Sequence, residues 1–248
     1  MNAELVAPKY DGDALVNLLP SVAACLRGEE PIILLPRAKK YVVLMVDGLG
    51  YELSDVYAGH AENLTRLDRL QLTCSVPSTT ATSLTSLGTG YAPGRHGVVG
   101  YSFYEPSVAA IVNALTWENG PRNVSSFRQV PTKFQQLRMQ GRSSAAVTLQ
   151  RFAGSALTAL AFAGTELVAR PSDENEVSGV VERVSQALTR HDIVYCYERL
   201  LDHSGHSYGF GSWQWLEQLV KVDDMVAALL DVASEDVCVC WSPAITAW

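Results

Sequence analysis

The sequence predicts an α/β protein with a mostly parallel central sheet flanked by helices. Residues 41–46 (YVVLMV) and 192–197 (DIVYCY) are short, nearly continuous apolar runs of the kind that form buried strands of parallel sheets. Amphipathic helical patterns alternate with such runs, which is typical of the α/β class. No repeat, heptad array or convincing linker interrupts the 248 residues. We therefore expect one domain over residues 1–248.

The first helix is expected over residues 12–27, where apolar residues recur at helical spacing ahead of Pro31. Hydroxyl side chains at residues 78–83 favour a second helix start, because they cap free backbone N–H groups. The other expected elements are helices over 64–72, 130–138, 156–164, 174–190 and 213–230, strands over 41–46, 101–104, 111–115, 143–147, 192–197 and 236–241, and polar loops over 117–127 and 148–155.

The composition is that of a folded globular protein whose partner is not a nucleic-acid polymer. Hydrophobic residues make up 48% and charged residues 18% of the chain. The formal net charge of -7 argues against a surface that binds a phosphate backbone, but a small phosphate ester held with cations is compatible with it. No basic n-region precedes an apolar segment, and no apolar run approaches the roughly 20 residues that span a bilayer. We expect a cytoplasmic protein without membrane association.

The five cysteines show no CxxC pair and no disulfide framework spacing. Cys196, Cys238 and Cys240 lie in apolar runs with strand character. We expect these three to be buried, reduced thiols.

Three polar clusters follow segments that we expect to be strands or helix starts. Asp47 opens an Asp-Gly-Leu-Gly turn directly after the strand at 41–46. This position lines the crevice where open α/β sheets bind ligands, although an isolated Asp-Gly is also a common helix-capping turn. The hydroxyl-rich segment at 78–83 begins a helix whose positive end favours phosphate and an alkoxide. Helix capping accounts for only one or two of the five hydroxyls in this segment, so the others favour a binding site.

Asp202 and His206 form the third cluster, just past the strand at 192–197. They are separated by a segment that contains Gly205, which we interpret as a turn that lets both side chains reach one cation. A carboxylate oxygen and an imidazole nitrogen suit zinc or a similar metal.

Together these clusters resemble the type I phosphodiesterase/nucleotide pyrophosphatase family of the alkaline phosphatase superfamily. The specific blocks are VDGLG at Asp47, the segment Thr80–Gly97 with its Thr-Gly pair and P-x-x-H-G bend, and D-x-x-G-H at Asp202. The resemblance extends from about Val42 to about Val239. It implies an alkaline phosphatase-like fold, incomplete at the C-terminal side and covering roughly the N-terminal two-thirds of the family domain, with residues 101–129 as a lid or insertion.

The resemblance also implies a metal-dependent hydrolase of phosphodiester or pyrophosphate bonds in nucleotide-type substrates. Counting back from the Thr-Gly pair places the nucleophile on Thr80, with Thr79 as the neighbouring alternative. Two divalent ions, expected to be zinc, would be bound by Asp47 with Thr80 and by Asp202 with His206. A small phosphate ester is the expected partner, and a covalent phospho-threonine is the expected intermediate.

Two departures from the family pattern affect this expectation. Ser83 stands where family members commonly place a phosphate-binding asparagine, so we expect Ser83, together with Thr79, on the substrate side of the site. The strand at 237–240 leads into Trp241–Trp248 instead of an Asp-His-Gly turn. Each metal then keeps two protein ligands. Loss of a residue that only hydrogen-bonds to a metal ligand already costs about 10 to 100-fold in metal affinity. We therefore expect weak zinc binding and slow turnover. Coding DNA with an Asp-His-Gly turn in a neighbouring frame beyond Cys240 would show a frameshifted tail.

Several other functions compete with the phosphodiesterase hypothesis. A phosphomonoesterase or phosphonate hydrolase of the same superfamily would use the same ligands. A sulfatase is disfavoured because the chain lacks Cys-x-Pro-x-Arg, and a Ser/His/Asp hydrolase because it lacks G-x-S-x-G. A non-catalytic remnant is a further alternative, and zinc content after dialysis distinguishes it from an enzyme.

Overall fold

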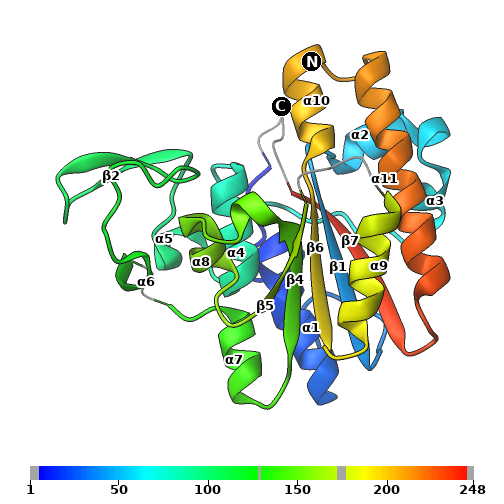
Figure 1. Cartoon of the computed structure of the whole chain (residues 1–248), viewed down its shortest axis with the longest axis horizontal. Helices are drawn as coiled ribbons and strands as arrows, with labels where there is room; N and C mark the ends of the chain where they lie inside the picture. Colours follow the sequence, from blue (N-terminus) through cyan, green and yellow to red (C-terminus); the bar gives the residue numbers. More distant parts are fainter. Residues whose placement is uncertain (1–5, 128–129, 172–176, 245–248) are drawn as a thin grey trace.

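The computed structural model describes residues 6–127, 130–171 and 177–244, and within them a five-stranded parallel sheet (Figure 1). The strand order is β5-β4-β6-β1-β7, and every pairing in it is parallel. The strands are β1 (Lys40–Asp47), β4 (Ser144–Leu149), β5 (Glu166–Arg170), β6 (Ile193–Glu198) and β7 (Val237–Ala244). The predicted α/β fold with a mostly parallel sheet is confirmed.

Helices cover both faces of the sheet, as Figure 1 shows. The α-helices are α1 (Leu18–Arg27), α2 (Tyr51–Val56), α3 (Glu62–Arg66), α4 (Thr80–Thr89), α5 (Pro93–His96), α6 (Val124–Phe127), α7 (Lys133–Met139), α8 (Ala156–Ala161), α9 (Val177–Leu188), α10 (Leu200–Tyr208) and α11 (Trp213–Val232). The 3-10 helices are η1 (Leu15–Asn17), η2 (Ala58–His60) and η3 (Gln150–Phe152). Among the described residues, none of these helices is long and apolar enough to cross a membrane.

Strand β1 divides the interior into two cores, which explains why its sequence is apolar without alternation. Every residue of β1 after Lys40 is buried. Val42, Leu44 and Val46 pack into the core shared with α3, α9 and α11. The alternate residues Tyr41, Val43 and Met45 pack into the core shared with α1, α4 and α7.

Most expected elements occur close to their predicted positions. The helix expected at 12–27 is η1 followed by α1, which ends at Gly28 in the left-handed conformation. The expected strands at 41–46, 143–147, 192–197 and 236–241 correspond to β1, β4, β6 and β7. The helix expected at 174–190 corresponds to α9, although residues 174–176 lie outside the described part of the chain. The helix expected at 130–138 begins later as α7, where Thr132 and Gln135 form a capping box.

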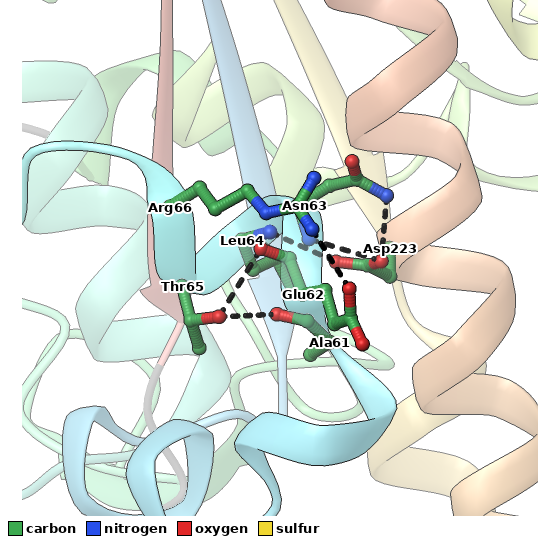
Figure 2. Close-up of polar contacts among 7 residues, drawn as sticks. All are labelled: Ala61, Glu62, Asn63, Leu64, Thr65, Arg66 and Asp223. Atoms are coloured by element: carbon green, nitrogen blue, oxygen red, sulfur yellow. Dashed lines mark hydrogen bonds and ion pairs between the residues drawn. The ribbon is translucent and has the colours of Figure 1, made fainter.

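The helix predicted over residues 64–72 is wrong in its position. Helix α3 spans Glu62–Arg66, and Leu67 is already extended. Asp223 on α11 fixes the start of α3, because its carboxylate accepts the backbone N–H groups of Asn63 and Leu64 at 3.2 and 2.8 Å (Figure 2). Beyond α3, Leu67 packs into the core of β1, α9 and α11, whereas Leu72 packs into the core on the opposite face of the sheet. These leucines therefore do not share one helix face.

Other differences involve short elements at the edges of the fold. Strand β5 was not expected because its side chains are mostly exposed or half-buried, so it lacks the apolar pattern of β1. Helix α2 was also not expected. The predicted polar segments at 117–127 and 148–155 contain the short helices α6 and η3. Cys196 is buried as predicted, but Cys238 and Cys240 are only half-buried because β7 is the outermost strand of the described sheet.

The segment expected to be a lid or insertion forms a two-stranded antiparallel hairpin of β2 (Ser102–Glu105) and β3 (Ala110–Asn113), followed by α6. Figure 1 shows it extending to one side of the sheet, beside α5 and α8. Phe103 and Val112 from the hairpin pack with Ala81 of α4 and Leu160 of α8 in a third, smaller core. The hairpin therefore lies against the helix that begins at Thr80.

Candidate active site

Asp47 is the most unusual polar group at the carboxyl end of the sheet. It is the last residue of β1 and is 1% exposed. Its Oδ2 atom accepts hydrogen bonds from Tyr197 Oη at 2.6 Å and from Thr80 Oγ1 at 3.1 Å. Its Oδ1 atom is buried, and no described residue donates a hydrogen bond to it. One carboxylate oxygen is thus held in place while the other keeps its capacity to bind a ligand.

Thr80 and Thr79 have different roles at the start of α4, which distinguishes the two candidate nucleophiles. Thr79 is the N-cap, and its Oγ1 accepts the backbone N–H of Thr82 at 3.3 Å. It also shares a hydrogen bond with the hydroxyl of Thr82 at 2.9 Å. Thr80 is the first residue of the helix, and its hydroxyl faces Asp47 instead. The geometry therefore favours Thr80 over Thr79 for chemistry at Asp47.

Gly48 allows α10 to approach the end of β1. Its φ angle is +76°, and a Cβ atom added there would lie 2.5 Å from the Cα of Asp202. Only glycine tolerates both the left-handed backbone and this contact. The close approach places the Asp202 carboxyl near Asp47, and its charge acts on that residue.

Asp202 and His206 lie in helix α10, so the predicted turn between them is wrong. They are one helical turn apart, and Asp202 Oδ1 lies 3.5 Å from His206 Nε2. Gly205 was interpreted as a turn residue, but it serves packing: a Cβ atom there would lie 2.8 Å from the ring of Phe210. The expected proximity of the two side chains is nevertheless present.

Three further polar side chains at this end of the sheet were not identified from the sequence. Tyr197 and Glu198 end β6, and Arg170 ends β5. Glu198 accepts the backbone N–H groups of Leu200 and Leu201 at 2.6 and 3.3 Å and so fixes the start of α10. Arg170 is 5% exposed and donates to the backbone oxygen of Tyr197 at 3.3 Å. The sequence offered one sign of Tyr197: a tyrosine at the end of a buried strand, whose hydroxyl usually has a hydrogen-bond partner when it is buried.

The electrostatics of the site oppose full ionisation of its buried acids. The pKa of Asp47 is raised to about 6: burial and the charge of Asp202 raise it, and the hydrogen bonds from Tyr197 and Thr80 and the backbone N–H of Gly48 lower it. Burial also raises the pKa of Glu198 to about 7, against the favourable effects of the two backbone N–H groups and Arg170. Two buried acids with raised pKa values thus lie at the carboxyl ends of β1 and β6.

Ser83 lies one turn after Thr80, on the same side of α4, and is fully buried. Its hydroxyl has no hydrogen-bond partner among the described residues. Its assignment to substrate binding remains a prediction, and so does that of Thr79.

The donor atoms suit divalent cations in type but not in number. Asp47 with Thr80 provides oxygens, and Asp202 with His206 provides an oxygen and a nitrogen, which are typical zinc ligands. The unpartnered Oδ1 of Asp47 is a further vacant acceptor. Within residues 6–127, 130–171 and 177–244, however, no group of three or more His, Cys, Asp or Glu side chains is arranged to hold a metal ion. Among the described residues, these donors therefore form two pairs and no larger cluster.

Known structures share this fold. The chain is similar to an inactive, threonine-to-alanine variant of murine ectonucleotide pyrophosphatase/phosphodiesterase 5 in complex with AMP, with a TM-score of 0.66 and 16% identity over 83% of this chain and 56% of that one. It is also similar to phosphonoacetate hydrolase from Sinorhizobium meliloti 1021 in complex with phosphonoformate, with a TM-score of 0.55 and 22% identity over 80% of this chain and 55% of that one. The chain thus spans little more than half the length of these structures.

Comparison with curated proteins gave no significant match. The model of one protein family, type I phosphodiesterase/nucleotide pyrophosphatase, matches residues 41–239. This range begins within β1 and ends within β7, so it contains Asp47, Thr80, Asp202 and His206. The chain therefore belongs to the type I phosphodiesterase/nucleotide pyrophosphatase family.

Proposed function

We propose that this chain is a metal-dependent hydrolase that cleaves phosphodiester or pyrophosphate bonds in small, nucleotide-type substrates, with Thr80 as its nucleophile. The observation that carries the proposal is the hydrogen bond of 3.1 Å from Thr80 Oγ1 to the buried Asp47. Family membership over residues 41–239 supports the reaction class. The mouse relative that was solved with AMP is inactive with a threonine-to-alanine substitution, which supports a threonine nucleophile.

In the proposed reaction Thr80 attacks the phosphorus of the substrate. Its hydroxyl proton points towards Asp47 Oδ2, so the oxygen lone pairs are available for attack. A Thr80 Oγ–phosphorus bond forms as the bond from phosphorus to the leaving oxygen breaks, and water then hydrolyses the phospho-threonine. The N–H groups of Thr80 and Ala81 have no acceptor within the helix and can donate to phosphate oxygens at the positive end of α4.

Asp47 with Thr80, and Asp202 with His206, would hold the two divalent cations proposed for the site. When bound, such cations, which we propose to be zinc, would supply positive charge opposite the nucleophile and the leaving oxygen. Tyr197 holds the Asp47 carboxylate in one orientation, because its hydroxyl donates to Oδ2. This orientation leaves Oδ1 available to bind a cation.

The test is hydrolysis of bis-p-nitrophenyl phosphate by the full chain with added zinc, together with zinc content after dialysis. Thr80→Ala is expected to abolish hydrolysis, whereas Thr80→Ser, which keeps the hydroxyl, retains part of it. Thr79→Ala is the matched control at the neighbouring residue. Activity that survives Thr80→Ala but not Thr79→Ala would assign the nucleophile to Thr79, and a folded chain with neither bound zinc nor hydrolysis would refute the proposal.

A phosphonate hydrolase is the second candidate, because the fold is also similar to that of phosphonoacetate hydrolase. Release of inorganic phosphate from phosphonoacetate measures this activity directly. A chain that cleaves phosphonoacetate faster than the diester, and loses both activities in Thr80→Ala, would keep the nucleophile and change the substrate class.

A further inference from the structure

His96 belongs to the P-x-x-H-G bend and has no part in the proposed reaction. It ends α5 and is fully buried, as are Ser86 of α4 and Val98. The backbone N–H of Val98 donates to His96 Nδ1 at 3.2 Å, so the proton of the neutral ring lies on Nε2. Burial lowers the pKa of His96 to about 4, which keeps the ring neutral at pH 7. His96 Nε2 is therefore a hydrogen-bond donor inside the fold.

His96 begins a buried chain of three hydrogen-bonded side chains. Its Nε2 atom lies 2.9 Å from Ser86 Oγ and donates to it. Ser86 Oγ also accepts the hydroxyl of Ser75 at 2.7 Å. Two donors thus occupy both acceptor positions of the Ser86 hydroxyl. The chain connects α5, through α4, to the segment that precedes Thr80.

Ser75 anchors this segment, which leads into the nucleophile. It is the one buried residue of residues 71–80, all of which the structure describes. Val76, the next residue, is 60% exposed. Thr79 caps α4 and so fixes the first turn of the helix, where Thr80 lies. The geometry of that turn therefore depends on the anchor at Ser75.

We propose that His96 is a positioning residue for the nucleophile, an inference that rests on the proposed role of Thr80. By donating to Ser86, His96 keeps the Ser86 hydroxyl oriented as the acceptor for Ser75. Without this donor the Ser86 hydroxyl turns towards another partner, and the anchor at Ser75 weakens. A misplacement of about 1 Å can cost about 10²-fold in rate. Loosening of residues 76–79 therefore slows turnover, although the buried ring of His96 does not reach the substrate.

The test compares two substitutions that separate the hydrogen bonds of His96. The amide of His96→Gln reaches the position of Nε2 and can still donate to Ser86, whereas the shorter amide of His96→Asn reaches only the position of Nδ1. Ser75→Ala removes the other end of the chain and leaves the bond between His96 and Ser86 intact. His191→Asn is the matched control, because His191 is also buried but precedes β6, at the amino ends of the strands.

The first measurement is hydrogen exchange of the backbone amides of residues 76–82, followed by mass spectrometry of the full chain. It needs no hydrolase activity. We expect exchange to be about tenfold faster in His96→Asn and in Ser75→Ala than in the wild type. The double variant should exchange no faster than either single variant, because both substitutions break the same chain of hydrogen bonds. His96→Gln and His191→Asn should exchange at the wild-type rate.

The second measurement is hydrolysis of bis-p-nitrophenyl phosphate. In His96→Asn, kcat should fall by about 10 to 100-fold while KM changes by less than about threefold, because the nucleophile is displaced and no group that binds substrate is removed. His96→Gln should restore kcat. A chain that shows the expected exchange but does not hydrolyse the diester would refute the proposed function and leave His96 as the anchor of this segment.

Other outcomes would overturn the positioning role itself. Wild-type exchange of residues 76–82 in Ser75→Ala is one, and this variant is decisive if His96→Asn does not fold. Equal effects of His96→Asn and His96→Gln, or faster exchange of this segment in His191→Asn, are others. An unchanged kcat in an active His96→Asn variant would show that the anchor does not act on the nucleophile.

Discussion

Replacement of Tyr197 by Phe tests whether the Asp47 carboxylate is held as the structure indicates. The substitution keeps the ring and removes only the hydroxyl that donates to Asp47 Oδ2 at 2.6 Å. Hydrogen bonds to charged groups contribute about 1.5–3 kcal/mol to stability. We therefore expect Tyr197→Phe to lower the free energy of unfolding by about this amount at pH 8, where Asp47 is ionised.

The loss should depend on pH in a defined direction. Asp47 has a pKa of about 6 in the fold against an ordinary 3.8, so the folded state binds its proton more tightly than the unfolded state. Stability from this group is therefore present at low pH and is lost as pH rises towards 6. Removing the Tyr197 hydroxyl raises the folded pKa further, by about one to two units from the same bond energy. The difference between variant and wild type should be larger at pH 8 than at pH 5.

Tyr195→Phe is the matched control on the same strand. The Tyr195 hydroxyl is also buried but has no hydrogen-bond partner among the described residues. Its removal should leave stability unchanged or raise it by about 1 kcal/mol, because an unsatisfied polar group is lost. Urea unfolding of both variants at pH 5 and pH 8, with chelator present, measures these effects. Equal destabilisation by the two variants, or a larger loss for Tyr197→Phe at pH 5, would refute the reasoning.

Three further predictions concern residues around the site. Gly48→Ala should lower the free energy of unfolding, measured in urea, by about 3 kcal/mol or more, because Gly48 has a φ angle of +76° and an added Cβ would contact Asp202. Gly50→Ala is the control and should cost about 1 kcal/mol or less, because an added Cβ there has no neighbour within 4 Å. Thr79→Ala should lower the free energy of unfolding by about 1 kcal/mol through loss of the α4 cap, and Thr79→Ser should restore it. Burial raises the pKa of Glu198 to about 7, so the folded state binds this proton more tightly than the unfolded state. The Tm of the wild type should therefore fall as pH rises from 4.5 to about 7, and Glu198→Gln should remove the contribution of this residue to the fall.

The parts of the fold that the sequence predicted are those in which one local pattern decides the structure. Residues 41–46 and 193–196 are apolar on both faces, and only a central strand between two cores buries them completely. The strand order was not predictable, because it depends on which strands pair across long sequence separations. The helix expected at 64–72 shows the same limit: its leucines belong to different cores, and its true start depends on Asp223, which is far away in sequence.

The candidate site also contains residues that the sequence predicted and residues that it did not. The closeness of Asp47 and Thr80 was expected from family resemblance, and the structure brings their side chains together. Tyr197, Glu198 and Arg170 were missed because two of them end an apolar run and the third ends an edge strand without a clear pattern. Gly205 was interpreted as a turn residue because glycine favours turns. It lies inside α10 instead, where the absence of a side chain leaves space for the ring of Phe210.

The arrangement around Asp47 is better explained by ligand binding than by stability. A carboxylate that only stabilised the fold would have both oxygens paired, because an unpaired buried oxygen costs about 1–3 kcal/mol. Asp47 Oδ2 receives two hydroxyl donors, while the equally buried Oδ1 receives none. Gly48 then brings Asp202 close, which adds a second negative charge and raises the pKa of Asp47. Both features destabilise the free chain, and a bound cation would offset both. We therefore expect that zinc raises the Tm of the wild type and raises it less in Asp202→Asn, whereas equal shifts in both would place any bound zinc away from these carboxylates.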